Sequence, residues 1–568
     1  MKRAALFTML LLSAAGFAFL QTTSPAPNLA ALMPSGALLY LETPDFGRLL
    51  RDWDTSQVKA DWLQSGNYAV FSRSNLFTKL QEVYGQYGEA AGFRPGLKSA
   101  VEIAGTDSAL ALYQIREVEF LYISRIAEAD LVKAELWTVR DKFEQRQAGG
   151  VPFYLRTDPA SKRTVAFAFT KGYLLVATRD DLVAQALQLL AGASSPNIAS
   201  DRWYHDAVSA APHPAELRLV MNLESLVRSV YFRSYWIQRN APVVRRYWAE
   251  VADVQRTADT VTENRVLLRA PDAAEPAPAA AADAVPGLLT LVPPEAGLYR
   301  ASRAGEPSEV AALIVQKLIA SQPRNSRDWR DAPAAISPDS PAGNEGDLET
   351  RIDEQPLPPD AGISDSIAAI RALVEKTGSR ALLLVQSSAQ LSGPFVRMRS
   401  VIVLDGAQDW DRATVRASLG AAAGKLWTTS RLGAGWAGGT AGRHPIERLD
   451  GLGTLMFAQR GRLLFIGNDT LLLASVLDRA GARPSSGALS YAAGFRHLRE
   501  RSNYEGVMTA LDFSASPGND HDLDQAPTFF SGNVGSLSRV LSKVTEVRTT
   551  EEERGGITLQ TVVYQMLP

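Results

Sequence analysis

Two distant segments of the chain, residues 165–192 and 454–481, repeat one order of apolar and polar positions. In each, a β-rich run meets a glycine, a second apolar run follows, and an aspartate then precedes apolar residues at helical spacing. The pattern predicts a β-hairpin and then an amphipathic helix, with the aspartate as its N-cap and a glycine as its C-terminal cap. Aligned without a gap, the segments match Gly172 with Gly461, Leu174 with Leu463, Leu175 with Leu464, Asp180 with Asp469 and Gly192 with Gly481.

Weaker matches extend the repeat along both halves in the same order, which indicates that the whole half is repeated. Two apolar motifs near the start of each half keep their spacing, and a strand-like run follows each pair. They are Leu32-Met33-Pro34, Leu39-Tyr40 and residues 118–124 in the first half, and Leu291-Val292-Pro293, Leu298-Tyr299 and residues 398–405 in the second. We therefore expect an α+β protein with two similar domains from an internal duplication, each an antiparallel sheet with helices packed on one face.

Low-complexity stretches predict the domain boundaries. Residues 271–286 are rich in proline and alanine, as in a semi-rigid linker, so the first domain is expected at 29–270 and the second at 287–568. The acidic, proline-rich stretch at about 325–362 has no periodic apolar face and is expected to be a disordered insertion in the second domain. In the first half, Trp62 to Tyr84 instead carries aromatic and apolar residues at helical spacing, so we expect any specialised surface in one of these two divergent regions.

The N-terminus has the pattern of a secretion signal. Lys2 and Arg3 precede an uncharged apolar run from Ala4 to Leu20, which is shorter than the roughly 20 residues of a membrane-spanning helix. No strong cleavage site follows the run, so residues 1–28 are expected to be either a cleaved signal peptide or an N-terminal anchor. Both alternatives predict an exported protein, located in the periplasm or anchored to the inner membrane by the uncleaved segment.

Composition excludes several classes of function. The chain has 59 basic and 61 acidic side chains and a formal net charge of −2, which gives no general electrostatic basis for binding nucleic acid. It contains no cysteine, which rules out disulfides, thiolate metal sites and cysteine nucleophiles. The remaining composition, 46% hydrophobic and 21% charged, is that of a globular protein.

No motif in the sequence predicts a catalytic, cofactor or metal site. Residues 433–438 match the letters of a dinucleotide-binding loop, but further glycines and Pro445 prevent the helix that this site needs, so we expect a flexible loop before a strand. The five histidines show no i, i+4 pair of the kind that binds metal on a helix. His205 and His497 lie at similar places in the two halves, and we expect a structural or surface role for them.

Aromatic and cationic residues alternate in residues 231–251. We expect two short helices here, broken near Pro242, whose aromatic rings pack on the domain and whose arginines extend to water. The alternative is a surface that binds a partner protein or a membrane. The candidate interaction surface consists of Tyr235, Trp236, Arg239, Arg245, Arg246, Tyr247 and Trp248.

The signal, the repeated motifs at Leu32 and Leu291, and the Gly172 and Gly461 turns together resemble exported bacterial proteins of domain of unknown function 3352. The resemblance implies a non-enzymatic protein and supplies no site residues. The first hypothesis is therefore a non-catalytic cell-envelope protein that binds an envelope protein or a membrane surface. The alternative is a periplasmic carrier of an apolar or lipid ligand, which predicts a large apolar cavity. A hydrolase with a dispersed site is the third, and it predicts a concave site that gathers polar groups from His205, His497 or Asp-rich loops.

Overall fold

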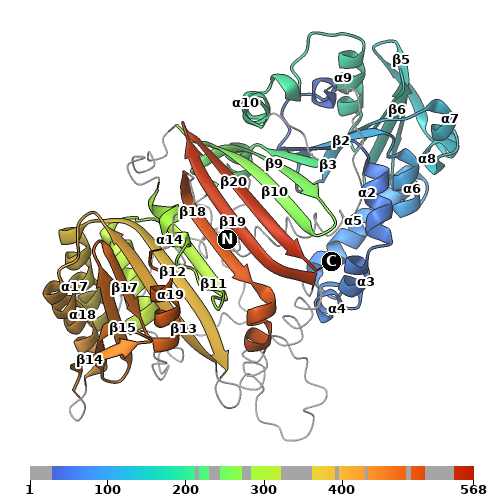
Figure 1. Ribbon diagram of the computed structural model, residues 1–568. Helices are drawn as coiled ribbons and strands as arrows, with labels where there is room; N and C mark the ends of the chain where they lie inside the picture. Colours follow the sequence, from blue (N-terminus) through green and yellow to red (C-terminus); the bar gives the residue numbers. More distant parts are fainter. Residues whose placement is uncertain are drawn as a thin grey trace, which may run out of the picture. The chain divides into compact units, whose positions relative to one another are not determined.

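A computed structural model of the chain describes residues 28–211, 216–228, 244–271, 283–320, 361–390, 396–428, 433–481, 488–505 and 543–567 (Figure 1). The structure divides into two compact units, which we call unit 1 and unit 2. Unit 1 comprises residues 1–277 and 496–568, and unit 2 comprises residues 278–495.

The sheet of unit 1 is built from antiparallel pairs. Its strand order is β4-β5-β6-β7-β3-β2-β1-β8-β9-β10-β20-β19. The strands are β1 (Leu39–Thr43), β2 (Asp107–Gln114), β3 (Glu119–Arg125), β4 (Glu144–Ala148), β5 (Val151–Thr157), β6 (Thr164–Thr170), β7 (Tyr173–Ala177), β8 (Leu217–Met221), β9 (Tyr247–Arg256), β10 (Thr260–Arg269), β19 (Val544–Arg554) and β20 (Ile557–Met566). The helices are η1 (Leu29–Leu32), α2 (Phe46–Asp54), α3 (Gln57–Leu63), α4 (Gly66–Phe71), α5 (Asn75–Ala91), α6 (Leu97–Ile103), α7 (Glu128–Leu131), α8 (Glu135–Thr138), η2 (Arg140–Lys142), α9 (Asp180–Leu190), η3 (Ile198–Ser200), α10 (Arg202–Ala210) and α11 (Leu223–Arg228).

Unit 2 is also an antiparallel sheet with helices. Its strand order is β14-β15-β16-β17-β13-β12-β11-β18. The strands are β11 (Leu298–Arg303), β12 (Ser379–Gln390), β13 (Val396–Gly406), β14 (Gly435–Ala441), β15 (His444–Asp450), β16 (Thr454–Arg460), β17 (Leu463–Gly467) and β18 (Leu489–Arg496). The helices are α14 (Ala284–Leu289), α15 (Pro307–Ile314), η5 (Val315–Ile319), α17 (Ala361–Thr377), α18 (Arg412–Trp427) and α19 (Thr470–Asp478).

The two sheets share one strand order. Strands β4-β5-β6-β7-β3-β2-β1-β8 of unit 1 correspond one by one to β14-β15-β16-β17-β13-β12-β11-β18 of unit 2. Strand β1 begins with the Leu39-Tyr40 motif and lies between β2 and β8. Strand β11 begins with the Leu298-Tyr299 motif and lies between the corresponding strands, β12 and β18. The α+β class with antiparallel sheets is confirmed, and descent of both units from a duplicated ancestor stays a prediction.

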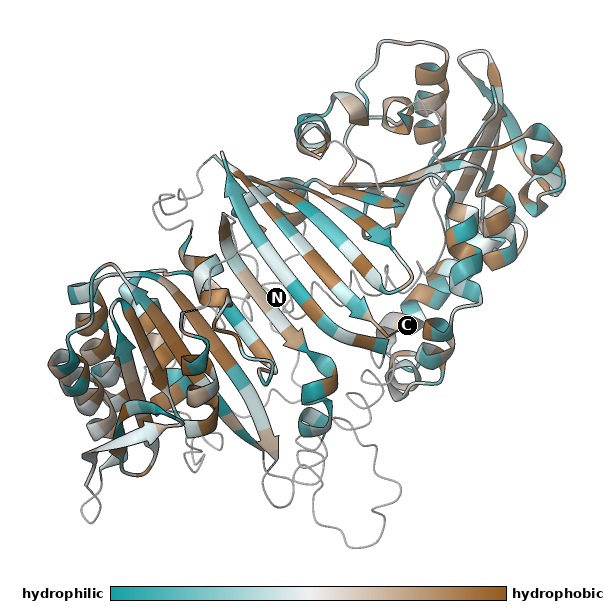
Figure 2. Cartoon of the chain, in the orientation of Figure 1, coloured by the Kyte–Doolittle hydropathy of each residue, from teal (hydrophilic) through white to brown (hydrophobic). Residues whose placement is uncertain are grey.

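Both sheets carry helices on two faces, whereas the sequence led us to expect one. In unit 1, Leu121 and Ile123 of β3 pack in one core with residues of α9, whereas Phe167 of β6 packs on the opposite face with residues of α5, α7 and α8. In unit 2, α14 and α19 cover one face, and α15, α17 and α18 cover the other. Strand β17 and the central part of β13, residues 401–404, are therefore continuous hydrophobic runs (Figure 2).

The predicted hairpin and helix form in both halves, but the predicted alignment is wrong by one residue. Both hairpins have two-residue turns, Lys171-Gly172 in one and Gly461-Arg462 in the other, so the glycines occupy different turn positions. Because side chains alternate between the faces of a strand, the predicted alignment matches residues that lie on opposite faces of the two sheets. Leu174, rather than Leu175, lies on the same face of its sheet as Leu464.

The ends of the two repeated helices also differ. Asp469 is the N-cap of α19 and its Oδ1 accepts the Leu472 N–H at 3.0 Å, as predicted. In α9 the N-cap is Arg179, and Asp180 lies in the first turn. Gly192 and Gly481, just after these helices, have positive φ angles of 94° and 118°, in agreement with a glycine terminator.

The domain boundaries differ from the predicted ones. The C-terminal strands β19 and β20 belong to unit 1, because β20 pairs along its length with β10. The predicted linker ends early, since α14 begins at Ala284 and buries Val285 and Pro286. The predicted signal and nearly all of the predicted disordered insertion lie outside the residues that the structure describes.

Candidate functional site: an apolar cavity in unit 1

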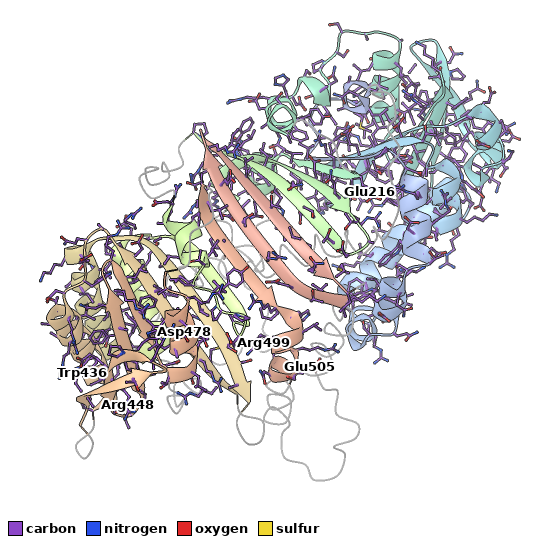
Figure 3. The ribbon with its side chains drawn as sticks, in the orientation of Figure 1. Glu216, Trp436, Arg448, Asp478, Arg499 and Glu505 are labelled. Carbon is purple, nitrogen blue, oxygen red and sulfur yellow. The ribbon has the colours of Figure 1, made fainter. Side chains whose placement is uncertain are left out.

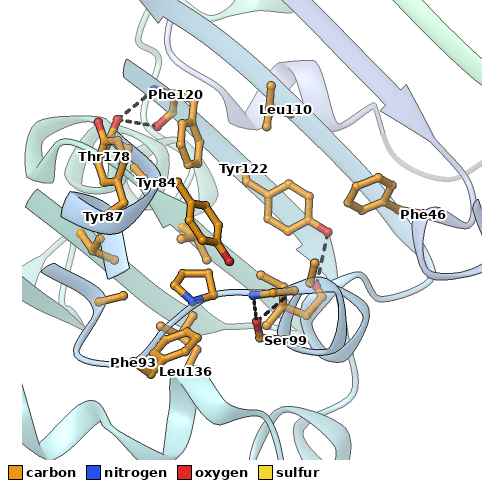
Figure 4. Close-up of a pocket in the computed structure, with 18 residues that line it drawn as sticks. Phe46, Tyr84, Tyr87, Phe93, Ser99, Leu110, Phe120, Tyr122, Leu136 and Thr178 are labelled. Carbon is orange, nitrogen blue, oxygen red and sulfur yellow. Dashed lines mark hydrogen bonds between the residues drawn. The ribbon is translucent and has the colours of Figure 1, made fainter. Parts of the chain in front are cut away.

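Unit 1 contains a half-open cavity of about 320 Å³ between helices and one face of the sheet (Figure 4). Helices α2, α5, α6 and α8 form one side, and strands β2, β3, β6 and β7 form the other. The lining is almost entirely apolar. It consists of Phe46, Tyr84, Tyr87, Ala91, Phe93, Pro95, Gly96, Ser99, Ala100, Ile103, Leu110, Phe120, Tyr122, Leu136, Val165, Val176, Ala177 and Thr178.

Small residues and a sharp turn in the chain hold the cavity open. Helix α5 ends at Gly92, whose φ of 76° is left-handed and suits a glycine terminator. The turn that follows packs closely on α5 at Gly88, where a Cβ would lie 3.4 Å from Phe93 O. Ala91 and Ala100 then line the cavity with single methyl groups, where larger side chains would fill it.

The polar side chains of the lining form hydrogen bonds within the protein. Thr178 Oγ1 accepts the Phe120 N–H at 2.9 Å, and the Ser99 hydroxyl donates to Gly96 O at 3.0 Å. The Tyr87 hydroxyl donates to Glu117 O at 2.9 Å. Since these groups already have partners, the wall offers a ligand mainly carbon surface.

A cluster of hydroxyl groups closes one end of the cavity wall. Tyr122 Oη lies 2.9 Å from Ser108 Oγ and also donates to the carbonyl of Ala104, while the Ser124 hydroxyl donates to Ile103 O at 2.7 Å. These bonds satisfy the last carbonyl groups of α6, which have no partner within the helix. Burial raises the pKa of Tyr122 to about 12, so its hydroxyl stays protonated at neutral pH.

Tyr84 lies at the open side of the cavity. Figure 4 shows its ring among the rings of Phe120, Tyr122 and Tyr87. It is 37% exposed, in contrast to the buried Tyr122. No hydrogen bond is found for its hydroxyl in the part of the chain that the structure describes, so Tyr84 offers a polar atom at the cavity mouth.

The corresponding face of unit 2 is packed with large side chains. Tyr122 pairs with Val176 in unit 1, and Ile402 pairs with Ile466 at the matching position of unit 2. Trp427 of α18, 2% exposed, and Leu419, fully buried, pack on this face with Ile402. Large buried side chains thus occupy this face of unit 2, whereas Ala91 and Ala100 line the cavity of unit 1.

The structure separates the residues of the predicted interaction surface. Tyr235, Trp236 and Arg239 lie outside the described residues. Arg245 and Arg246 are exposed in the turn before β9, but Tyr247 and Trp248 belong to the strand itself, so the predicted helix is wrong at that point. Trp248 is partly buried, and the guanidinium of Arg202 lies 4.6 Å from its ring centroid.

The predicted histidines occupy different environments. His205 is exposed on α10, with Nδ1 at 3.1 Å from Asp206 Oδ1. His497 is buried and stacks on Tyr504. Burial lowers the pKa of His497, and the charge of Arg501 acts in the same direction. The structure therefore gives the two histidines different surroundings.

The described residues contain no group of three or more histidine, aspartate or glutamate side chains placed to hold a metal ion. Within the same ranges, none of the helices combines the length and the hydropathy that a membrane crossing requires.

Sequence reasoning did not find the cavity, although one signal pointed to its region. The segment from Trp62 to Tyr84 is one of the two divergent regions in which the sequence predicts any specialised surface, and Tyr84 lines the cavity. The remaining lining comes from strands and helices that are distant in the sequence. No local motif marks them.

No protein-family model and no curated protein matches the chain. Among solved structures, the chain is similar to crystal forms I and III of TP0453, both at 11% identity and a TM-score of 0.24. The match to form I covers 44% of this chain and 82% of that chain, and the match to form III covers 45% and 83%. A similarity at this TM-score supports no inference about fold or function.

Proposed function

We propose that this protein is a non-catalytic binder of an apolar ligand, held in the cavity of unit 1. The observation that supports the proposal is the half-open hollow of about 320 Å³, lined almost entirely by carbon. Ligand pockets usually have volumes of about 300–1,000 Å³, so this one suits a small apolar molecule or a segment of one acyl chain. Among the hypotheses drawn from the sequence, the carrier of an apolar or lipid ligand predicts a large apolar cavity; this cavity is apolar but lies at the small end of the range for ligand pockets.

The chemistry of the wall favours a hydrocarbon over a polar molecule. Burial of apolar surface contributes roughly 0.8 kcal/mol per methylene group. A buried polar group of the ligand would find few free partners, because Ser99, Thr178 and Tyr87 are already hydrogen-bonded. A ligand with a polar end would therefore keep that end at the mouth, beside Tyr84.

The predicted export would place such a binder outside the cytoplasm, where it could carry an insoluble molecule between envelope sites. Export, an envelope location and the resemblance to the exported family remain predictions from the sequence. Binding through the surface around Trp248 also stays a prediction, and no contact of Arg245 or Arg246 favours it over the cavity.

The first prediction concerns occupancy of the cavity. The full chain should bind the apolar fluorophore N-phenyl-1-naphthylamine, and fatty acids should displace it more strongly as the chain lengthens, up to the length that the hollow accommodates. Ala100→Phe places a ring in the cavity, so we expect at least about a tenfold loss of fluorophore affinity. Fluorescence titration measures both effects.

A matched control is available on the other unit. Ala372→Phe adds the same ring to an exposed position of α17 and should leave fluorophore affinity unchanged. Circular dichroism of both variants checks the fold. Equal binding by wild type and Ala100→Phe, or no displacement by any fatty acid, would refute a ligand site in this cavity.

A further inference from the structure

The edge strand β14 of unit 2 has an unusual composition for an exposed edge. Its seven residues, Gly435 to Ala441, include three glycines and no charge, and all except Trp436 and Ala441 are exposed. It pairs with β15 on one side. Within the described ranges of the chain, no strand pairs with its other side, and β14 lies at the outer end of its sheet (Figure 1).

The matching edge in unit 1 is protected by charge. Strand β4 holds the corresponding place in the strand order, and its sequence is Glu-Gln-Arg-Gln-Ala. Arg146 on this strand forms ion pairs with Glu144 at 2.9 Å and with Asp180 at 3.0 Å. Charged side chains on an edge strand oppose pairing with another strand, and β14 lacks them.

The glycines of β14 are not required by packing within unit 2. Neither Gly435 nor Gly438 has a positive φ, and a Cβ at either position would meet no atom within 4 Å. Glycine inside a strand weakens it and is typical of a place where another backbone approaches closely. The space over Gly438 is therefore open, and packing within unit 2 does not explain the missing side chain.

Trp436 fixes the strand in place. Its ring lies 5.5 Å from that of Phe457 in an edge-to-face contact, and the guanidinium of Arg416 lies 5.7 Å from it. Gly420 of α18 allows this contact, since a Cβ there would lie 3.0 Å from the indole nitrogen. Figure 3 shows Trp436 at the outer end of the unit 2 sheet. Trp436 thus anchors this edge strand to the core of unit 2.

We propose that β14 is a dimerisation edge, at which a second copy of this chain adds its own β14 in antiparallel register. The two-residue turn after Ala441 makes the Ala441–His444 pair a hydrogen-bonded one, so the backbone groups of Trp436, Gly438 and Thr440 point away from β15. A two-fold axis at Gly438 pairs these three residues with Thr440, Gly438 and Trp436 of the other copy.

A second copy fits this edge for three reasons. An antiparallel strand is complementary to itself about a two-fold axis, which is the commonest symmetry of homo-oligomers. No charge on β14 opposes its own copy. The register also sets Gly438 against Gly438 of the other copy, so no side chain opposes the close approach of the two backbones at the axis. This inference does not depend on the cavity of unit 1.

The test uses the full chain and its oligomeric state. Sedimentation velocity over a concentration series should show a monomer–dimer equilibrium for the wild type. Gly438→Lys and Gly438→Glu each place like charges directly opposite across the axis, so each should weaken dimerisation by at least about tenfold. An equimolar mixture of the two variants should restore a heterodimer, because the charges are then opposite.

Gln147→Lys, which adds the same charge to the edge strand β4, is the control and should remain dimeric. Circular dichroism checks that each variant is folded. A monomeric wild type at every concentration overturns the proposal, and so do Gly438 variants that dimerise as well as the wild type. Binding of an added extended peptide by a monomeric wild type would assign the edge to a different partner.

Discussion

Glu42 in β1 is a partly buried carboxyl group whose neighbours shift its pKa in opposite directions. Burial raises the pKa of its carboxyl group, while a hydrogen bond from the Tyr40 hydroxyl at 2.8 Å and the charge of Arg218 act in the opposite direction. Arg218 itself forms a bidentate pair with Asp253, with both contacts at 2.7 Å. The arginine is thus shared, and the net effect on Glu42 is a raised pKa.

A pH dependence follows from this raised pKa. The folded state holds the Glu42 proton more tightly than the unfolded chain does, so the associated stability is present below the unfolded pKa and is lost as pH rises through the folded value. Glu42→Gln keeps an acceptor for Tyr40 and carries no charge. It should raise the melting temperature at pH 7 and bring no gain at pH 4, as measured by calorimetry. Equal gains at both pH values would contradict this account.

The repeated helices α9 and α19 differ in how their N-termini are stabilised. Asp469 caps α19 with its side chain, whereas Asp180 stands one position later in α9 and contributes charge near the helix start. The glycine of the preceding turn misled the sequence alignment, because either position of a two-residue hairpin turn accepts a positive φ. The type of each element was therefore predictable from the sequence, but its register was not.

This difference predicts unequal costs for the two aspartates. Asp469→Ala removes the cap of α19 and should destabilise unit 2 by about 1 kcal/mol. Asp180→Ala removes an exposed ion pair and a favourable charge at a helix start, for which we expect about 0.5 kcal/mol in unit 1. Denaturant unfolding measures both. Asp469→Asn keeps a capping oxygen and should recover most of the loss; failure to recover would exclude the cap as the cause.

At the scale of the whole molecule, the chain returns to its first unit at the end. Strands β19 and β20 extend the sheet of unit 1, and Val562 of β20 lies opposite Glu263 of β10. The sequence places this strand hundreds of residues after its partner. A boundary predicted from composition therefore assigned it to the nearer domain.

The return of the chain makes unit 1 sensitive to changes near the C-terminus. Val562 is 7% exposed, so Val562→Asp buries a carboxylate next to Glu263 and should destabilise unit 1 by about 3 kcal/mol or more. Hydrogen exchange should show faster exchange in β10 and unchanged exchange in β12 and β13. Leu567→Asp, at a residue 44% exposed, is the control and should change neither.

The apolar cavity could not be predicted because its lining is assembled from many elements. Tyr84 lies in a segment that the sequence marks as divergent, but Leu110 and Val176 read as ordinary strand residues. Whether such residues face a packed core, as Ile402 does, or a hollow depends on the size of the side chains that the opposite helices supply.

The sequence by itself determined the α+β class, the repeated hairpin and helix, and the lack of cysteine chemistry, because periodicity and composition act locally. Tertiary structure decided which face of each strand is buried, which unit receives the last two strands, and where a hollow remains. These depend on pairings and side-chain volumes brought together from distant parts of the chain, and local patterns do not encode them.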